Sequence, residues 1–294
     1  FTVNASGSPQ VGYQWQKGGV NIAGATLPTY TLRNLQLEDN GTYRVVVSNS
    51  SGSVTSNGAD LNIALPGTLA EFTHGLAAYY PFNGNANDAS GNGNHGTVNG
   101  ATLAADRNGT AGRAYRFDSN TISLPNGFNL QGNQVTISAW VNADSDDQGD
   151  WGQIVGSKRD IDNSRNISMF VKGTTRRLTI EVDTEDSNVV NKFQMDGTSQ
   201  YEHGTWFLAT MVYDGNTLSE YINGVKGASM AATGNLTSGH AWKIGGATNE
   251  SGGGWHFNGK IDDIRIYDRA LSATEVAQLH TLELPPPPTI TAQP

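Results

Sequence analysis

The chain has 294 residues, a net charge of −9 and 36 glycines, with 36% hydrophobic and 15% charged residues. This balance is typical of short strands joined by many turns, and the length suits two domains rather than one. The acidic charge, with never more than two adjacent Lys or Arg, argues against a nucleic-acid or anionic-membrane surface, and the absence of cysteine excludes disulfides and thiol chemistry.

Residues 1–64 predict a run of short strands separated by turns. Tyr13 and Trp15 fall on one face of the first clear strand, GYQWQK, and Tyr43 and Val45 share a face of another, YRVVVSN. This period of two is typical of strands that bury one face. The segment ALPGTLAEFTHG then interrupts the pattern and predicts a hinge.

From Leu76 to about Tyr267 the alternation of strands and turns resumes. The turn at Asn223-Gly224 is typical of a type I′ hairpin. The clearest predicted strands are QVTISAWVNA, NISMFVKG, RRLTIEVDT, WFLATMVYD, LSEYING, AWKIGG and KIDDIRIYD. So many short strands predict an all-β architecture.

One short helix is predicted near the C-terminus. Ser272 and Glu275 form a capping box at the start of SATEVAQLH, with Leu271 placed as a hydrophobic staple. The prolines that follow in LELPPPPTITAQP predict a semi-rigid, extended linker over residues 284–294. The final TITAQP has the pattern of the first strand of a further module.

Trp15, the run Asp39-x-Gly41-x-Tyr43 and the spacing between them make residues 1–65 resemble a cysteine-free bacterial immunoglobulin-like domain. The resemblance implies that Tyr43 forms a tyrosine corner and that valines fill the place of the usual disulfide. It also implies that strand A is missing before FTVNASG, and the tail PTITAQP resembles that strand. We therefore expect a piece of a longer array, with the hypothesis that the tail of one molecule pairs with the open edge of another's first domain.

The segments GLAAYYPFNGNANDASGNGNHGTVNGA, TISAWV, YDGNTLSEYING and FNGKIDDIRIY follow one another in an order that makes residues 66–283 resemble a laminin-G-like, concanavalin A-like lectin/glucanase domain. The resemblance implies a jelly roll of two antiparallel sheets in a secreted or cell-surface protein. Many such domains bind carbohydrate, often with calcium, and many bind proteins. The expected fold class is all-β: a truncated immunoglobulin-like sandwich, then a larger jelly roll with one short C-terminal helix.

Residues 87–94, NDASGNGN, concentrate oxygen-bearing side chains and glycines in one turn. Calcium takes about six to eight oxygen ligands, and carboxylate, amide and carbonyl groups of one loop can supply several of them. We therefore predict a structural Ca²⁺ held by Asp88 and Asn92, and the resemblance implies a further carboxylate from Asp262 or Asp263. The alternative is a metal-free turn capped by Asn and Asp side chains.

Trp151 and Trp255 stand in polar loops, DSDDQGDWG and ESGGGWHF, without buried periodicity. A tryptophan exposed on a loop often contacts a ligand, and sugars stack on such rings. We predict a carbohydrate site at these two residues, with Asp150, Arg159 and His256 as polar companions. Alternatively, each ring fixes its own loop onto the sandwich.

Three other tryptophans are predicted to be structural. Trp206 shares a face with Leu208 and Val212, which predicts a place in the core, and Trp242 opens a predicted strand. Trp140 lies on the face of its strand opposite the apolar residues. Because TISAWV is a recurrent strand of the resembling family, we expect a neighbouring segment to cover this ring.

Glu181, Asp183 and Glu185 resemble the E-x-D-x-E run of laminarinase-type glucanases, in which one Glu is the nucleophile and the last Glu the acid/base. Strand alternation places all three on one face, and retaining hydrolysis needs two carboxyls about 5–5.5 Å apart. The preceding RRL lacks the aromatic residue usual before such a run, and acids alternating with apolar residues are typical of a strand with one solvent-facing side. We therefore expect no catalysis, and a glucanase is the minor alternative.

The sequence predicts a non-catalytic extracellular module that binds a polysaccharide or other glycan on a calcium-stabilised jelly roll. Adhesion to a cell-surface protein, or spacing within a repeat array, is the alternative, favoured by the modular arrangement and the proline-rich linker. We expect neither a nucleic-acid partner nor membrane insertion. A cleft lined by Trp151 or Trp255 would favour glycan binding over adhesion.

Overall fold

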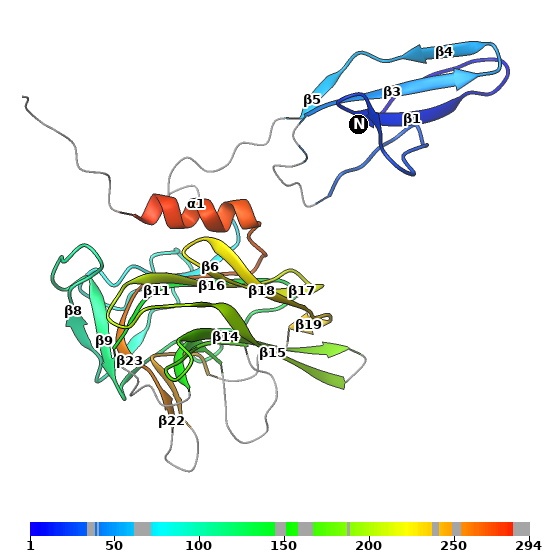
Figure 1. The fold of residues 1–294 in the computed structure, drawn as a ribbon. Coiled ribbons are helices and arrows are strands. Elements are labelled where there is room, and N and C mark those ends of the chain that lie inside the picture. The colour runs from blue at the N-terminus through cyan, green and yellow to red at the C-terminus, as the bar shows by residue number, and fades with distance from the viewer. Residues whose placement is uncertain are drawn as a thin grey trace, which may run out of the picture. The chain divides into compact units, whose positions relative to one another are not determined.

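The computed structural model describes residues 1–33, 39, 41–61, 72–144, 151–157, 167–186, 189–236, 241–248 and 254–284. The chain divides into two compact units, Phe1–Gly67 and Thr68–Pro294, close to the boundary predicted after residue 65. Within the described ranges both units consist of antiparallel strands, with a single helix near the C-terminus (Figure 1). The predicted all-β class is therefore confirmed. No helix in these ranges is long and apolar enough to cross a membrane.

The first unit contains one five-stranded antiparallel sheet. Its order is β2-β1-β3-β4, and β5 also pairs with β3. The strands are β1 (Gly12–Lys17), β2 (Val20–Asn21), β3 (Gly41–Asn49), β4 (Gly52–Thr55) and β5 (Ala59–Leu61). In the β1–β3 pair Trp15 lies opposite Val45, so the two predicted strands meet through their apolar faces.

The core of the first unit is aromatic. Trp15, Tyr43 and Val45 are buried, as the period of two predicted. The Phe1 ring stacks on Tyr43 with centroids 4.8 Å apart. The Tyr43 hydroxyl donates to the Asp39 carbonyl at 2.8 Å, a bond of the kind expected for a tyrosine corner.

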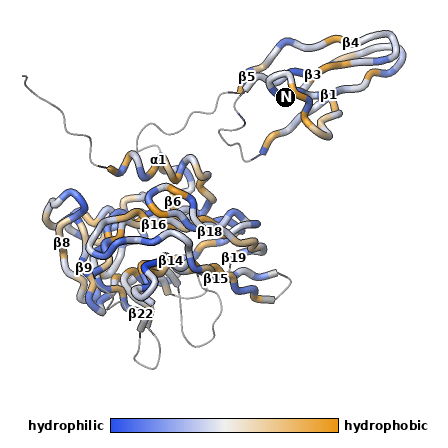
Figure 2. The backbone as a smooth tube through the Cα atoms, viewed as in Figure 1, coloured by the Kyte–Doolittle hydropathy of each residue, from blue (hydrophilic) through white to orange (hydrophobic). Residues whose placement is uncertain are grey.

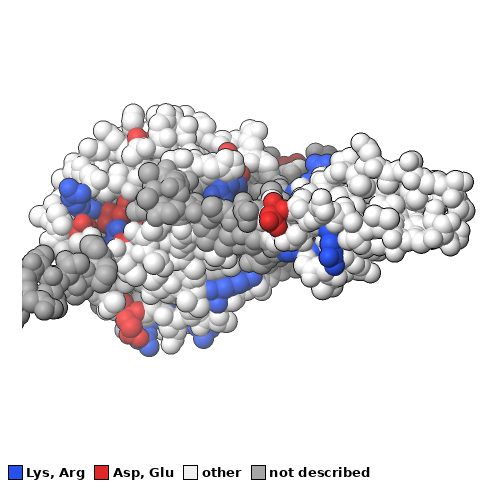
Figure 3. Space-filling model, turned by 90° about the horizontal axis from the view of Figure 1, so that it is seen from above, with Lys and Arg blue, Asp and Glu red and all other residues white. Residues whose placement is uncertain are grey.

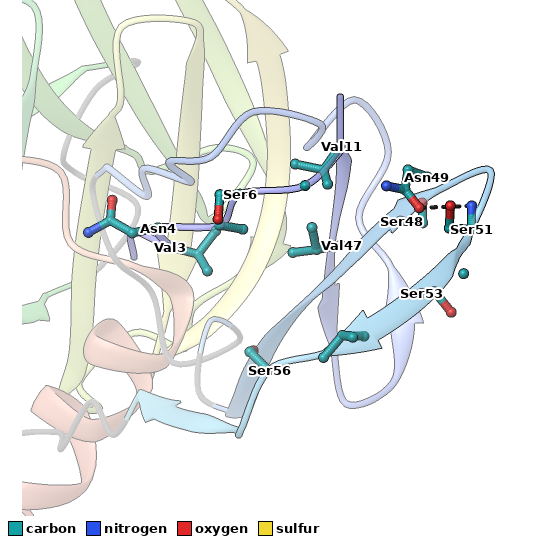
Figure 4. Close-up of a pocket in the computed structure, with 14 residues that line it drawn as sticks. Val3, Asn4, Ser6, Val11, Val47, Ser48, Asn49, Ser51, Ser53 and Ser56 are labelled. Atoms are coloured by element: carbon teal, nitrogen blue, oxygen red, sulfur yellow. Dashed lines mark hydrogen bonds between the residues drawn. The ribbon is translucent and has the colours of Figure 1, made fainter. Parts of the chain in front are cut away.

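A groove of about 550 Å³ lies beside β4 in the first unit (Figure 4). In the described part of this unit β4 pairs only with β3, so its other edge is open, and Val54 on this strand is 74% exposed. Val11 and Val47 lie together on the groove wall, and the Ser51 amide donates to Asn49 Oδ1 at the tip of the hairpin. Such open edges are places where a further strand can add.

The second unit has two eight-stranded antiparallel sheets and a separate β21–β22 hairpin. The β13 sheet has the order β15-β14-β13-β12-β20-β10-β7, with β19 beside β14; the β11 sheet has the order β18-β17-β16-β11-β23-β9-β8, with β6 beside β23. The strands are β6 (Leu76–Tyr80), β7 (Thr97–Asn99), β8 (Thr102–Ala104), β9 (Ala114–Asp118), β10 (Thr121–Ser123), β11 (Val135–Ala143), β12 (Gly152–Gly156), β13 (Ile167–Lys172), β14 (Arg177–Asp186), β15 (Val189–Gln200), β16 (Phe207–Tyr213), β17 (Thr217–Ile222), β18 (Val225–Ala231), β19 (Asn235–Leu236), β20 (Lys243–Ile244), β21 (Gly246–Thr248), β22 (Gly254–His256) and β23 (Asn258–Tyr267).

One hydrophobic core lies between these two sheets. Ile137 and Val141 of β11 contribute to it from one sheet, and Ile180 and Val182 of β14 from the other. All four are fully buried, and they are the apolar positions of the alternating predicted strands. The sequence pattern therefore identified the inner face of each sheet.

Helix α1 (Ala273–Glu283) lies against the outer face of the β11 sheet (Figure 1). The predicted capping box is present, because Ser272 Oγ accepts from the Glu275 amide and the Glu275 carboxylate accepts from the Ser272 amide. Buried Val276 packs with Tyr267 in a second apolar cluster. Figure 2 shows hydrophobic and hydrophilic residues alternating along α1, as expected for a helix with one buried face.

Trp140 and the end of α1 meet at a buried carboxylate. Glu283 is 3% exposed; its Oε2 accepts from Trp140 Nε1 at 2.6 Å, and its Oε1 pairs with the Arg265 guanidinium. Arg107 Nε donates to the Glu283 carbonyl at 3.0 Å, and its guanidinium lies over the Trp140 ring, 4.8 Å from the centroid. The expectation that a neighbouring segment covers Trp140 is therefore confirmed.

Arg107 also joins two adjacent carboxylates of β23. Its Nη1 donates to Asp262 Oδ2 at 2.9 Å and to Asp263 Oδ2 at 2.7 Å, and the Tyr79 hydroxyl donates to Asp263 Oδ1 at 2.7 Å. Burial and the neighbouring Asp263 raise the pKa of Asp262, and Arg107 opposes that rise. We call the following residues the helix-anchor network: Arg107, Trp140, Asp262, Asp263, Arg265 and Glu283.

A second buried carboxylate joins the edge strands of the two sheets. Glu220 on β17 is fully buried, and its Oε1 accepts from the amides of Thr198 on β15 (3.0 Å), Ser199 on β15 (3.4 Å) and Ala228 on β18 (3.1 Å). Gly227 leaves room for this carboxylate, because a Cβ there would collide with Glu220 Oε1. One side chain thus bonds strands that belong to opposite sheets.

Replacing Glu283 with Gln should lower the free energy of unfolding of the second unit by about 3–5 kcal/mol, because Arg265 would lose a buried counter-ion. Glu202→Gln is the matched control, since the ion pair of Glu202 with Arg176 is solvent-exposed and should contribute at most about 1 kcal/mol. Denaturant unfolding followed by tryptophan fluorescence measures both changes. Equal losses for the two variants would contradict the importance assigned to the helix-anchor network.

Candidate functional site

The face of the β13 sheet turned away from the core carries the two predicted tryptophans and the acids of β14. On this face Phe170 of β13 lies opposite Thr179 of β14, and Ser168 lies opposite Glu181. Gln153 of β12 lies opposite Phe170 from the other side. The face is polar but closely packed, because Gln153, Ser168 and Thr179 are all fully buried.

Trp151 and Trp255 come together on this face around one phenylalanine. The Trp151 and Phe170 rings are nearly perpendicular, with centroids 5.6 Å apart, and Trp255 contacts Phe170 with centroids 6.3 Å apart. Phe170 is fully buried, whereas both tryptophans are only half-buried. Two segments separated by about a hundred residues therefore place their indoles against one buried phenylalanine.

An ion pair adjoins the aromatic group. Lys172 Nζ lies 4.4 Å from the centroid of the Trp151 ring and donates to Asp196 Oδ2 at 2.7 Å. The Thr179 hydroxyl donates to Asp196 Oδ1 at 2.7 Å. Burial alone would raise the pKa of the Asp196 carboxyl, but the bonds from Lys172 and Thr179 outweigh it and lower that pKa. The site therefore combines apolar rings with a fixed ammonium and a fixed carboxylate.

Of the three predicted polar companions, the structure describes only His256, which lies apart from this group. His256 neighbours Trp255 on β22, and consecutive strand residues point to opposite faces. It lies opposite Gly246 of β21. Asp150 and Arg159 lie outside the described residues.

Glu181, Asp183 and Glu185 share one face of β14, as predicted, because Ile180 and Val182 between them belong to the core. The expectation that these acids face solvent is wrong for two of them: Glu181 is 4% exposed and Asp183 is 0% exposed. Alternation tells which face a side chain takes, but not whether another part of the chain covers that face. A catalytic carboxylate must reach its substrate, and neither buried acid is accessible in this arrangement.

Asp88 uses its carboxylate to organise its own loop. It accepts hydrogen bonds from the amides of Tyr79 (2.9 Å), Ser90 (2.8 Å) and Asn94 (2.9 Å), and from the Ser90 hydroxyl (2.9 Å). Burial alone would raise the pKa of Asp88, but these bonds outweigh it and hold that pKa below its usual value. The bond from Ser90 back to Asp88 forms an Asx turn, the metal-free alternative for this loop.

The predicted calcium ligands do not form one oxygen cluster. The lone pairs of Asp88 face N–H and O–H donors, both N–H groups of the Asn92 amide go to the Leu76 and Ala77 carbonyls, and Asp262 pairs with Arg107. No group of three or more His, Asp or Glu side chains among the described residues is arranged to hold a metal ion. The residues present therefore do not fit a calcium ion at Asp88.

Of the two remaining predictions for tryptophans, one is confirmed and one is wrong. Trp242 is fully buried with Phe128 edge-on against it, as predicted. Trp206 is only half-buried, so its assignment to the core is wrong. The alternation in β16 was correct, but Phe207 and Met211 face the core, whereas Val212, on the face predicted for Trp206, packs under α1. Both faces of β16 are buried, so apolar character alone did not distinguish them.

Sequence reasoning missed Phe170, Lys172 and Asp196. A signal for the first two existed, since alternation in NISMFVKG places Phe170 and Lys172 together, opposite Met169 and Val171. Asp196 had no such signal. Only the pairing of β13, β14 and β15 brings it to Lys172.

A sequence model described as the concanavalin A-like lectin/glucanases superfamily matches residues 117–277, more than half of the chain. No curated protein matches at a significant level. Among solved structures, domain 4 of AbnA, a GH43 extracellular arabinanase from Geobacillus stearothermophilus in complex with arabinotriose, is similar with a TM-score of 0.54 and 24% identity, over 70% of this chain and 98% of that chain.

Two toxin structures are similar as well. The binding domain of Paraclostridial Mosquitocidal Protein 1 has a TM-score of 0.55 at 18% identity, over 71% of this chain and 52% of that chain. A structure of botulinum neurotoxin type C has a TM-score of 0.54 at 13% identity, over 74% of this chain and 53% of that chain. Cell entry of this toxin is dependent upon interaction with two ganglioside molecules. This chain therefore spans about half the length of both, and the likenesses show a shared fold.

Asp88→Asn should lower the free energy of unfolding by about 2 kcal/mol or more at neutral pH, because an amide cannot accept all the bonds that the carboxylate accepts. The lowered pKa gives this contribution a pH dependence: it is complete above the unfolded pKa of about 4 and is lost as pH falls through the folded value. The free energy of unfolding, measured from pH 7 to pH 2, should show this loss in the natural sequence and not in the variant.

A chelator should leave the unfolding temperature of the chain unchanged. A fall of several degrees would restore the calcium hypothesis.

Proposed function

The chain belongs to the concanavalin A-like lectin/glucanases superfamily, and on this premise we propose that its second unit is a non-catalytic module that binds glycans outside the cell. The observation that carries the proposal is the convergence of Trp151 and Trp255 on Phe170 beside the Lys172–Asp196 ion pair. Indole rings offer apolar surface to the C–H groups of a sugar, and an ammonium with a carboxylate offers a donor and acceptors to its hydroxyls.

The similar structures support glycan binding as a general function, without supporting a particular glycan. The arabinanase domain was solved with arabinotriose, and cell entry of the type C neurotoxin depends upon interaction with two ganglioside molecules. The likeness to the neurotoxin covers 53% of that chain, so the arabinanase domain, covered to 98%, is the stronger support. Identity below 25% transfers no residue roles, and the site proposed here rests on this chain's own side chains. On the face drawn in Figure 3, which is the side of the view that carries α1, basic and acidic groups are scattered and form no extended patch of one sign.

Trp151→Ala should weaken glycan binding at least tenfold, because the ring and the anchor for Lys172 are both lost. Asp196→Asn should weaken it severalfold by releasing Lys172. A glycan array identifies a binding oligosaccharide for the 294-residue chain, and calorimetry with that oligosaccharide measures the variants. Trp206→Ala is the matched control, since Trp206 is equally half-buried but belongs to the other sheet, and it should leave the affinity unchanged.

The same preparations separate a binding module from an enzyme. No reducing sugar should be released from β-1,3-glucan, because Glu181 and Asp183 are buried. Hydrolysis that Glu181→Gln abolishes would instead assign a glucanase. Loss of binding in Trp206→Ala to the same extent as in Trp151→Ala would remove the proposed site.

For the first unit we propose an immunoglobulin-like spacer whose open edge accepts a strand. The tyrosine-corner bond of Tyr43 supports the fold, and the groove beside β4 supports the partner surface. The occupant we propose is the tail of a second copy, because residues 289–292, TITA, alternate polar residues with apolar ones that suit a groove containing Val3, Val47 and Val54.

Sedimentation velocity tests this pairing. The 294-residue chain should associate as its concentration rises, whereas a variant ending at Leu284 should remain monomeric. Val54→Lys should also remain monomeric, because a lysine on an edge strand opposes the addition of another strand. Leu103→Lys, which changes an exposed apolar residue of the second unit, should associate normally. A monomeric full chain at all concentrations would refute the pairing.

A further inference from the structure

A polar pocket of about 420 Å³ lies in the second unit, away from the aromatic group. Its walls come from the chain before and at the start of β6, from the Asn-rich loop, from the loop between β10 and β11, and from the residue that follows β23. Its size falls within the range of sites for small molecules, about 300–1,000 Å³.

Two asparagines form one wall in fixed orientations. Asn92 Nδ2 donates to the Leu76 carbonyl at 2.8 Å and to the Ala77 carbonyl at 3.1 Å, and Asn94 Nδ2 donates to the Ala77 carbonyl at 2.9 Å. With the NH₂ groups held by the strand, each Oδ1 lies on the opposite side of its amide. Neither Oδ1 accepts a hydrogen bond within the described ranges. The wall therefore offers two amide oxygens as hydrogen-bond acceptors.

A carboxylate and an aromatic ring complete the pocket. Asp268 is exposed, and its carboxylate forms no hydrogen bond or ion pair with the residues that the structure describes. The backbone holds it in place, because the Asp268 amide donates to the Gly75 carbonyl at 2.8 Å. Phe128 is half-buried and rests perpendicular to the buried Trp242, with centroids 5.3 Å apart. The ring is thus rigidly supported while part of it remains accessible.

These groups select a class of ligand. Side-chain acceptors without an opposing cation suit a ligand rich in O–H donors, and Asp268 would repel a phosphate, sulfate or uronate. One carboxylate is few for calcium, which prefers more oxygens and gains nothing from an aromatic wall. We propose that this pocket is a second saccharide site, which takes a neutral monosaccharide unit through the amide oxygens of Asn92 and Asn94, the carboxylate of Asp268 and the ring of Phe128.

The two sites involve different sheets. Trp151 directly precedes β12 of the β13 sheet, whereas the pocket is lined by the start of β6 and by Asp268, which follows β23 of the β11 sheet. Two weak sites on one module can bind a branched or multivalent glycan more tightly than either site alone.

Titration of the ¹⁵N-labelled full chain with methyl β-galactoside, methyl β-glucoside and methyl α-arabinofuranoside tests the pocket, with the side-chain amides of Asn92 and Asn94 as reporters. At least one of these glycosides should shift both resonances with a millimolar Kd. Methyl β-glucuronide, which carries a negative charge, should shift neither. Asp268→Asn and Phe128→Leu should each weaken binding at least tenfold. Asp118→Asn, a change at another exposed aspartate, should leave it unaltered.

The outcomes that overturn the proposal are distinct from those of the first site. The pocket is not a saccharide site if no glycoside moves these amides, or if Asp268→Asn binds normally while folded. It is a cation site if calcium chloride moves them and the glycosides do not. Trp151→Ala should leave the titration unchanged, so either site can fail without the other.

Discussion

A buried network of charges fixes the C-terminal helix onto the β11 sheet, and the layering of the second unit depends on it. Glu283 ends α1, Arg107 stands between β8 and β9, and Asp262 lies on β23, so three distant segments meet at one place. A buried charge without its partner is strongly destabilising, so these segments order together. α1 and Arg107 cover Trp140, and β11 is buried along its whole length, so the outer face of the sheet is closed at this strand.

Within the described ranges, two other buried carboxylates are stabilised without a counter-ion. Asp88 and Glu220 are buried carboxylates that accept hydrogen bonds from backbone amides, of β6 and one loop for Asp88 and of edge strands from both sheets for Glu220 Oε1. Amides held by the fold replace water at no further ordering cost, which rigidifies the chain around them. In the Asn-rich loop these bonds order the backbone around Asp88, and Asn92 and Asn94 of the same loop line a pocket.

The sites proposed for ligands in the second unit lie where residues remain partly exposed, at Trp151 and Trp255 and in the pocket at the start of β6. Both proposed saccharide sites combine an aromatic ring supported by another ring with polar groups held by hydrogen bonds, Trp151 on Phe170 in one case and Phe128 on Trp242 in the other. Rings and polar groups that are fixed before binding lose little entropy when a ligand arrives. The first unit differs, because its available surface is the edge of a strand, which suits a peptide chain rather than a sugar.

The sequence alone determined the all-β class, the alternating inner faces of β11 and β14, the capping box of α1 and the burial of Trp15 and Tyr43, because each follows from local periodicity or a short motif. It also singled out Trp151 and Trp255, but it could not supply Phe170 as their common support or Asp196 as the partner of Lys172. Tertiary structure decided what contacts cross between strands: that Asp262 faces Arg107 rather than a metal, that Glu181 and Asp183 are covered, and that Trp206 is not. Periodicity specifies the face a side chain takes, and only the packing of distant segments specifies what lies against that face.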